Sequence, residues 1–386
     1  MSQTPSLADE SLQLVKTIDV GGNGLGVFDI SFVDPSLGLY VLADRTNASI
    51  DFVDTTNNTF LGRIGGFVGV VHNPDGTANN SLSGPDGVLI ADRRVVWAGD
   101  GDSTVKVIDL VAGKITDTIS TGGKFRVDEM AYDPRDHIIA VANNADTPPF
   151  ITMIDTDSHV ILGKITMDGT NNTPDAQGGI EQSQWSPRTG LFYLSVPQLG
   201  DNPALGGLAV IDPRTLSVQK VFEVPNCTPG GLALGPRRQA LIGCSASFGT
   251  APNVLTQSVI ISITDGTIEA NIPEVGGSDE VWYDRGTHHY YLAARNNTDN
   301  TGKITPVLGS IDARTNTFDG SAPTSTTAHS VAADSRLRRI FVPIGFVPPG
   351  SPPGTDPTNP CPDRGCIAVF VPSGNDDSNS SQQASR

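Results

Sequence analysis

Apolar and polar residues alternate along this chain in a unit that recurs roughly every 50 residues. In the clearest copy, polar residues 126–129 precede a short apolar stretch that ends at Asp133-Pro134, and a second apolar stretch covers residues 137–144. A third stretch ends at Asp155. Short apolar stretches between Asp, Pro and Gly turns are typical of β-strands. Because no long segment repeats apolar residues at helical spacing, we expect little helix.

Seven of these units align at their polar starts. The starts are Phe28-Asp29-Ile30-Ser31, Pro85-Asp86-Gly87-Val88, Val127-Asp128-Glu129-Met130, Ile180-Glu181-Gln182-Ser183, Thr228-Pro229-Gly230-Gly231, Ser278-Asp279-Glu280-Val281 and Ala328-His329-Ser330-Val331. Second and third strands follow each start, and a fourth follows in most units, as at residues 114–119. Seven units of four strands predict an all-β fold, a seven-bladed β-propeller with antiparallel four-stranded blades.

The two ends of the chain complement each other. The last unit lacks a fourth strand, because the chain becomes polar soon after Phe370, whereas residues 14–20 resemble the fourth strands of other units. We therefore expect the N-terminal strand to complete the seventh blade and close the ring, which leaves no open sheet edge. Residues 12–374 are expected to form this single propeller, and the polar stretches 1–11 and 375–386 to be disordered tails.

Three insertions, at residues 65–84, 166–179 and 345–362, interrupt the regular spacing of the repeats. The first two precede innermost strands, so we expect them to overhang the same face as the polar starts.

Five third strands end in an aspartate whose side chain is expected to form a hydrogen bond with its own backbone in a turn. These aspartates are Asp54, Asp109, Asp155, Asp212 and Asp312.

The charge and the cysteine content indicate which partners and which cellular compartment suit the protein. The net charge is −17, which disfavours binding to nucleic-acid phosphates. No apolar run reaches membrane-spanning length, and we expect a monomer without a membrane span. Cys227 and Cys244 lie where neighbouring strands can pair them, and Cys361 and Cys366 can close a small loop. Two disulfides would indicate an oxidising compartment; a zinc site is less favoured because no His lies near, and free thiols are the other alternative.

The N-terminal residues also bear on the compartment in which the protein is expected. The stretch from Met1 to Glu10 has no apolar core, so it does not read as a signal peptide. We expect a secreted or periplasmic protein given as its mature form, and a cytoplasmic one otherwise.

The polar starts predict where chemistry would occur. Innermost strands line the axial channel of a propeller, so the starts should converge on one mouth, with a small-molecule ligand in it. Two carboxylates ~5 Å apart repel by roughly 3 kcal/mol at an effective dielectric of ~20. A ring of acids therefore either binds a hard cation such as Ca²⁺ or Mg²⁺, or holds carboxyls of raised pKa that suit acid–base catalysis. The predicted metal ligands are Asp29, Asp86, Asp128, Glu181 and Asp279. The predicted catalytic residues are His329, Glu129, Glu181 and Glu280.

Two considerations limit that prediction. Strand alternation would turn only one member of each adjacent pair, Asp128-Glu129 and Asp279-Glu280, toward the channel. Solvated acids neutralised by Arg126 or Lys124 are the alternative to a functional ring. No motif for an organic cofactor, nucleophile elbow, P-loop or zinc protease occurs.

The repeats resemble those of YVTN-type propellers. Ala140-Val141-Ala142-Asn143 stands where that family has its Tyr-Val-Thr-Asn-like strand, and Met153-Ile154-Asp155-Thr156 where it has a Val-Ile-Asp-Thr-like strand. The resemblance implies a propeller fold and is one of architecture; the family includes surface-exposed and periplasmic proteins. Related propellers include lactone hydrolases of the gluconolactonase type, but their Glu/Asn/Asn/Asp metal ligands have no residue-by-residue match here.

Two functions are consistent with this reading. The first is a small-molecule enzyme, a hydrolase or a lyase/isomerase, with its site at the axial mouth and with or without a divalent metal. The second is a non-catalytic secreted propeller that binds a protein or carbohydrate partner through loops over the same face.

Overall fold

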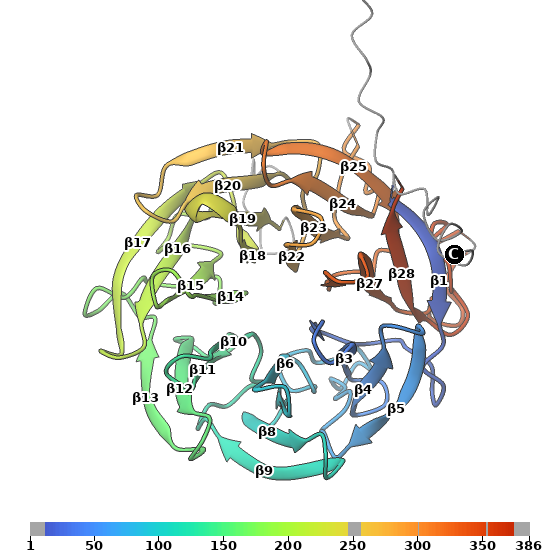
Figure 1. Ribbon diagram of the computed structural model, residues 1–386, viewed down its shortest axis with the longest axis horizontal. Helices are drawn as coiled ribbons and strands as arrows, with labels where there is room; N and C mark the ends of the chain where they lie inside the picture. Colours follow the sequence, from blue (N-terminus) through green and yellow to red (C-terminus); the bar gives the residue numbers. More distant parts are fainter. Residues whose placement is uncertain (1–11, 246–255, 300, 353, 374–386) are drawn as a thin grey trace, which may run out of the picture.

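The computed structural model describes residues 12–245, 256–299, 301–352 and 354–373, and its strands form seven separate four-stranded antiparallel sheets (Figure 1). The predicted tails, residues 1–11 and 375–386, lie outside the described residues. The sheets stand around a common axis as the blades of a propeller, which confirms the predicted fold class and blade count. No helix of the described residues is long and apolar enough to cross a membrane.

Each blade runs from an innermost strand outward in chain order. Blades one to three comprise β2 (Ser31–Asp34), β3 (Leu39–Asp44), β4 (Ser49–Asp54) and β5 (Thr59–Gly65); β6 (Val88–Ala91), β7 (Val95–Gly99), β8 (Thr104–Asp109) and β9 (Lys114–Ser120); and β10 (Met130–Asp133), β11 (Ile138–Asn143), β12 (Phe150–Asp155) and β13 (Ile161–Thr166). Blades four to six comprise β14 (Ser183–Ser186), β15 (Leu191–Val196), β16 (Leu205–Asp212) and β17 (Ser217–Pro225); β18 (Pro229–Leu234), β19 (Gln239–Cys244), β20 (Ser258–Ser262) and β21 (Ile268–Ile272); and β22 (Val281–Asp284), β23 (His289–Ala294), β24 (Val307–Asp312) and β25 (Thr317–Pro323). A 3-10 turn, η1 (Pro236–Arg238), follows β18.

The seventh blade is built from both ends of the described chain. It contains β26 (Ala332–Asp334), β27 (Arg339–Ile344), β28 (Cys366–Pro372) and, on its outer edge, β1 (Leu12–Ile18). Strand β1 pairs antiparallel with β28, with Leu12 opposite Pro372 and Ile18 opposite Ile367. The predicted closure of the ring is therefore confirmed, and the edge of β28 is covered.

Apolar side chains fill the spaces between neighbouring blades. The second strand of each blade is buried on both faces along almost its whole length, which explains its nearly continuous apolar sequence. One cluster joins blades one and two through Val41, Ile50, Ile90 and Val96, and equivalent clusters lie at the other interfaces. This packing fixes the blades in place, so the residues at the starts of the innermost strands stand on a rigid frame.

The five turn aspartates have the predicted structural role. The side chain of each accepts a hydrogen bond from a backbone N–H two or three residues later, as when Asp54 accepts from Thr56 at 2.7 Å and Asp109 from Val111 at 2.7 Å. Both predicted disulfides are also present, Cys227–Cys244 and Cys361–Cys366. Cys227 lies just before β18 rather than within it.

Candidate functional site

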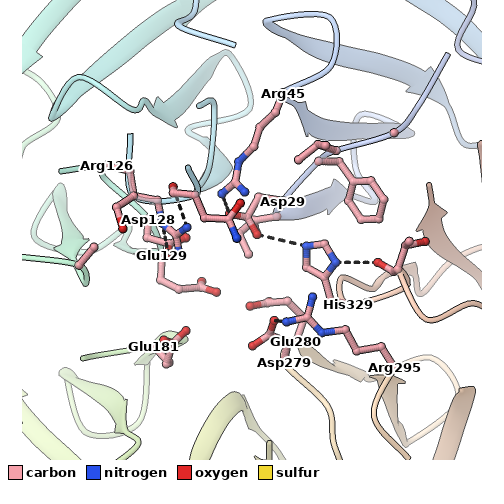
Figure 2. Close-up of a pocket in the computed structure, with 18 of the residues that line it drawn as sticks. Asp29, Arg45, Arg126, Asp128, Glu129, Glu181, Asp279, Glu280, Arg295 and His329 are labelled. Carbon is pink, nitrogen blue, oxygen red and sulfur yellow. Dashed lines mark hydrogen bonds and ion pairs between the residues drawn. The ribbon is translucent and has the colours of Figure 1, made fainter. Parts of the chain in front are cut away.

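The polar starts of the innermost strands surround a cavity of about 520 Å³ at one mouth of the channel (Figure 2). We call this cavity the axial mouth. Seven of the eight residues predicted for the site line it: Asp29, Asp128, Glu129, Glu181, Asp279, Glu280 and His329. The eighth, Asp86, is fully buried behind the wall and contacts the lining residue Arg45. The structure thus brings side chains from five blades together.

The expectation from strand alternation was wrong. Both Asp128 and Glu129 line the cavity, and so do Asp279 and Glu280. The reason is that β10 begins only at Met130 and β22 only at Val281, so these acids precede the regular strands. In this non-strand segment, successive side chains are not forced to opposite faces.

Three arginines pair with the aspartates of the mouth. Arg45 bridges Asp29 and Asp86, Arg126 pairs with Asp128 at 2.6 Å, and Arg295 pairs with Asp279 at 2.8 Å. Of the two cations considered from the sequence, Arg126 is placed as expected, whereas Lys124 is exposed and does not line the cavity.

Arg45 and Arg295 were missed in the sequence. They hold equivalent positions, each directly after the second strand of its blade. The end of that strand lies at the same mouth as the start of the innermost strand, because the two strands are antiparallel. Aligning second-strand ends as well as innermost-strand starts would have revealed both guanidinium groups.

Glu129 and Glu280 lie within hydrogen-bonding reach of each other at the base of the cavity. Both are almost completely buried. Burial raises the pKa of Glu129 to about 8, with Asp128 and Asp29 adding to the effect and the hydrogen bond with Glu280 opposing it. Burial, and then the neighbouring Glu129, raise the pKa of Glu280 well above its ordinary value. A hydrogen bond between two carboxyls needs at least one proton, and the raised pKa values of both groups keep the pair protonated at neutral pH.

Gln182 fixes the position of this pair. Its amide nitrogen donates to Glu280 Oε2 at 2.6 Å. Its amide oxygen accepts from the backbone N–H of Leu232 at 2.5 Å and of Val281 at 3.3 Å. The Leu232 donor comes from blade five, where Pro229 and Gly230 stand in place of the acid found in other blades. Blade five therefore contributes a backbone N–H here instead of an acid, and Gln182 of the neighbouring blade four accepts from it.

Glu181 is a third carboxyl of raised pKa. It is buried beside the same cavity, and burial followed by the charges of Asp279 and Asp128 raises its pKa well above the ordinary value. Asp29 has the opposite behaviour: although burial disfavours its charge, Arg45 and a hydrogen bond with His329 hold its pKa well below the usual range. The mouth therefore contains both protonated and ionised carboxyls, which suits acid–base chemistry.

His329 is held in one orientation. Its Nδ1 lies 2.7 Å from the carbonyl oxygen of Thr327, so Nδ1 carries the hydrogen. Its ring stacks on Phe28, with ring centroids 4.7 Å apart, and Nε2 lies 3.3 Å from Asp29 Oδ1. Nε2 either accepts a proton from a molecule in the cavity or carries one and pairs with Asp29.

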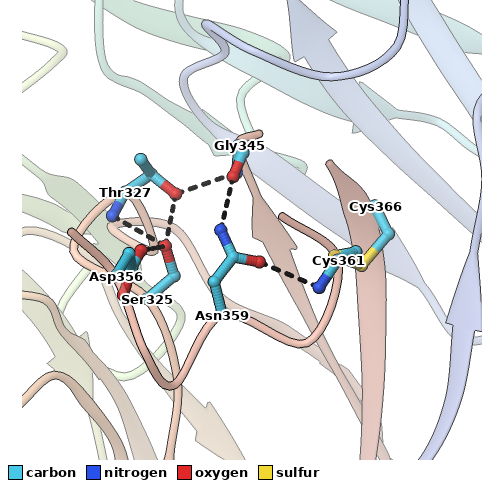
Figure 3. The surroundings of a disulfide bond; sticks show 7 residues. All are labelled: Ser325, Thr327, Gly345, Asp356, Asn359, Cys361 and Cys366. Atoms are coloured by element: carbon cyan, nitrogen blue, oxygen red, sulfur yellow. Dashed lines mark hydrogen bonds between the residues drawn. A yellow bond between two sulfur atoms is a disulfide. The ribbon is translucent and has the colours of Figure 1, made fainter. Parts of the chain in front are cut away.

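The insertion at residues 345–362, which is rich in proline, contacts the segment that precedes His329 (Figure 3). Asp356, in this insertion, accepts hydrogen bonds from Ser325 Oγ at 2.6 Å and from the backbone N–H of Thr326 at 3.2 Å. Asn359 donates to the carbonyl of Gly345, whose N–H donates to Thr327 Oγ1. The Cys361–Cys366 disulfide closes the end of the insertion next to Asn359. The insertion thus supports the segment whose carbonyl binds His329.

The predicted metal ligands do not converge on one point. Asp29, Asp128 and Asp279 direct carboxylate oxygens to guanidinium groups, as does Asp86. Among the described residues, no group of three or more His, Cys, Asp or Glu side chains is arranged to hold a metal ion. As the side chains stand, they fit a site neutralised by arginines better than a Ca²⁺ or Mg²⁺ site.

Comparisons with known proteins show the fold alone. No protein-family model and no curated protein sequence matches the chain. A structure of U3-55K is similar over 95% of this chain and 100% of its own, with a TM-score of 0.64 and 10% sequence identity. Kuenenia stuttgartiensis hydrazine synthase is similar over 82% of this chain and 92% of its own, with a TM-score of 0.64 and 13% identity. At such identities the likeness extends to the propeller and not to the site, and the resemblance to YVTN-type repeats stays a prediction.

Proposed function

We propose that the protein is an enzyme that acts on a small polar molecule in the axial mouth, by hydrolysis or by lyase/isomerase chemistry. The observation that carries the proposal is the buried Glu129–Glu280 pair, two adjacent carboxyls of raised pKa at the base of a cavity of about 520 Å³. A cavity of this volume suits a small molecule.

The pair can serve as acid and base in one reaction. After one carboxyl of the pair has lost its proton, it takes a proton from the substrate or from an attacking water, and the other, protonated carboxyl gives one to the departing oxygen. The number of protons on the pair is then unchanged, so no other proton source is required. Glu181 and His329 line the same cavity and are the candidates for a second proton transfer.

The walls favour a substrate with carboxylate and hydroxyl groups. Arg295 uses Nη2 to pair with Asp279, and in the part of the chain that is described no partner is seen for its other two nitrogens. A guanidinium with open donors binds a carboxylate well, whereas ionised Asp29 and Asp279 accept from hydroxyl groups. We therefore assign the substrate to hydroxylated carboxylic acids, or to lactones that carry a further carboxylate.

A panel of hydroxy acids, sugar acids and lactones tests this assignment by turnover. The wild type should convert at least one class, and Glu129→Gln/Glu280→Gln should reduce kcat at least ~100-fold, as expected for loss of acid–base catalysis. Glu269→Gln, on the exposed face of β21, is the matched control. Metal analysis before and after dialysis against a chelator decides whether Ca²⁺ or Mg²⁺ takes part. Binding of a panel member without turnover, in both wild type and variant, would favour the non-catalytic alternative.

A further inference from the structure

A second cavity, of about 610 Å³, opens at the other mouth of the channel. We call it the opposite mouth. It is lined by the far halves of the innermost strands and the turns that follow them, and it shares Ile30, Glu129 and Glu280 with the axial mouth. The carboxyl pair thus separates two cavities of different chemistry, and the proposed catalytic role of the pair makes no use of the second one.

The wall of the opposite mouth is aromatic. Two of the three tryptophans of the chain, Trp185 and Trp282, line it together with Phe32. Phe32 and Trp282 meet edge to face, with ring centroids 5.4 Å apart. Trp185 is covered on one side by Arg135, whose guanidinium lies 5.7 Å from the ring centroid. The indole Nε1 of Trp185 is buried and has no hydrogen-bond partner among the described residues, although a buried donor normally has one.

Three exposed arginines stand at the rim: Arg188, Arg238 and Arg285. They lie in the turns that follow β14, β18 and β22. Within residues 12–245, 256–299, 301–352 and 354–373, none of the three guanidinium groups makes an ion pair or a side-chain hydrogen bond. By contrast, Arg214 and Arg314, on outer turns, pair with Asp212 and Asp312. In a chain of net charge −17, three unpaired guanidinium groups at the rim of one cavity need an explanation.

We propose that the opposite mouth binds an anionic ligand with a flat apolar body, such as an aromatic carboxylate or sulfonate. The guanidinium groups pair with the anion at the rim, and the indole rings stack on the body. The orientation follows from the two ends of the cavity: the arginines that attract an anion stand at the rim, whereas the floor holds the carboxyl groups of Glu129 and Glu280, so the charged end stays at the rim. The arginines likewise disfavour a cationic ligand of the same shape.

Calorimetric titration of the full chain tests this with three probes that share a ring: naphthalene-2-sulfonate, 2-naphthylmethanol and 2-naphthylmethylammonium. We expect the sulfonate to bind at least ~10-fold more tightly than the alcohol, and the ammonium most weakly, because two or three charge-assisted contacts are added or opposed. Arg188→Gln/Arg285→Gln should remove about tenfold of the affinity for the sulfonate and leave that for the alcohol unchanged.

Arg94→Gln/Arg214→Gln is the matched control, since it removes the same charge at arginines outside the cavity. It should bind all three probes as the wild type does. The proposal is overturned if the wild type does not bind the sulfonate, if sulfonate and alcohol bind equally, or if the control weakens sulfonate binding as much as Arg188→Gln/Arg285→Gln. None of these outcomes depends on turnover in the axial mouth.

Discussion

Replacing Glu129 with Gln should make the protein more stable at alkaline pH and should leave its stability at acid pH unchanged. The pKa of Glu129 is raised from 4.5 to about 8 in the folded protein. A carboxyl with a raised folded-state pKa contributes stability that is fully present below the unfolded pKa and is lost as the pH rises through the folded one. The wild type should therefore lose this contribution between about pH 4.5 and about pH 8.

The size of the effect follows from the shift. A shift from 4.5 to about 8 corresponds, at about 1.4 kcal/mol per unit, to on the order of 5 kcal/mol in the free energy of unfolding. Glutamine resembles the protonated acid, because its amide can still donate to Glu280 and carries no charge. The variant should thus keep the low-pH stability at every pH, and the difference from wild type should grow to a few kcal/mol above about pH 8.

Urea unfolding at a series of pH values measures this difference directly. Glu269→Gln, on exposed β21, is the control and should follow the wild type throughout. If the free energies of unfolding of wild type and Glu129→Gln stay parallel from about pH 5 to about pH 9, Glu129 is not a buried protonated acid, and the proton-sharing pair must be given up.

Three other perturbations test parts of the structure around this pair. Arg45→Met leaves Asp29 and Asp86 buried without their shared guanidinium and should lower the free energy of unfolding in urea by about 3–5 kcal/mol. The double variant Arg45→Met/Asp86→Asn should recover part of this stability, and no recovery would argue against the bridge. Asp356→Ala should free the His329 ring, seen as faster exchange of its Nδ1 proton by NMR, whereas Asp363→Ala, at an exposed site directly after the same insertion, should not. Equal effects would show that the insertion does not hold the ring. Cys227→Ala/Cys244→Ala opens a loop with a sequence separation of 17 and should cost about 3 kcal/mol in the free energy of unfolding, and an unchanged value would show that this bridge constrains little.

The fold could be predicted from the sequence because each blade repeats the same local pattern. Apolar second and third strands, turn aspartates such as Asp109, and a spare strand near the N-terminus all specify one architecture. These signals are local in the chain, and the ring closure follows from counting strands.

The site could be predicted only in part, because its members come from separate blades. The acids stand out since each opens a repeat, and the axis of the propeller brings them together. Arg45 and Arg295 are flexible side chains after second strands, and whether such a guanidinium reaches Asp29 or Asp279 depends on loop geometry. The aromatic opposite mouth was also missed, because Trp185 and Trp282 lie in strands where a tryptophan is ordinarily read as core.

The protonation state of the Glu129–Glu280 pair tests the central claim most directly. An infrared spectrum of protein labelled with ¹³C at the glutamate carboxyl carbons separates protonated from ionised side chains at neutral pH. We expect protonated glutamate in the wild type, and we expect Glu129→Gln/Glu280→Gln to lose the part that the pair contributes, while Glu181 retains its own. A wild-type spectrum with every glutamate ionised at neutral pH would contradict the account, because the base of the mouth would then hold no proton to transfer.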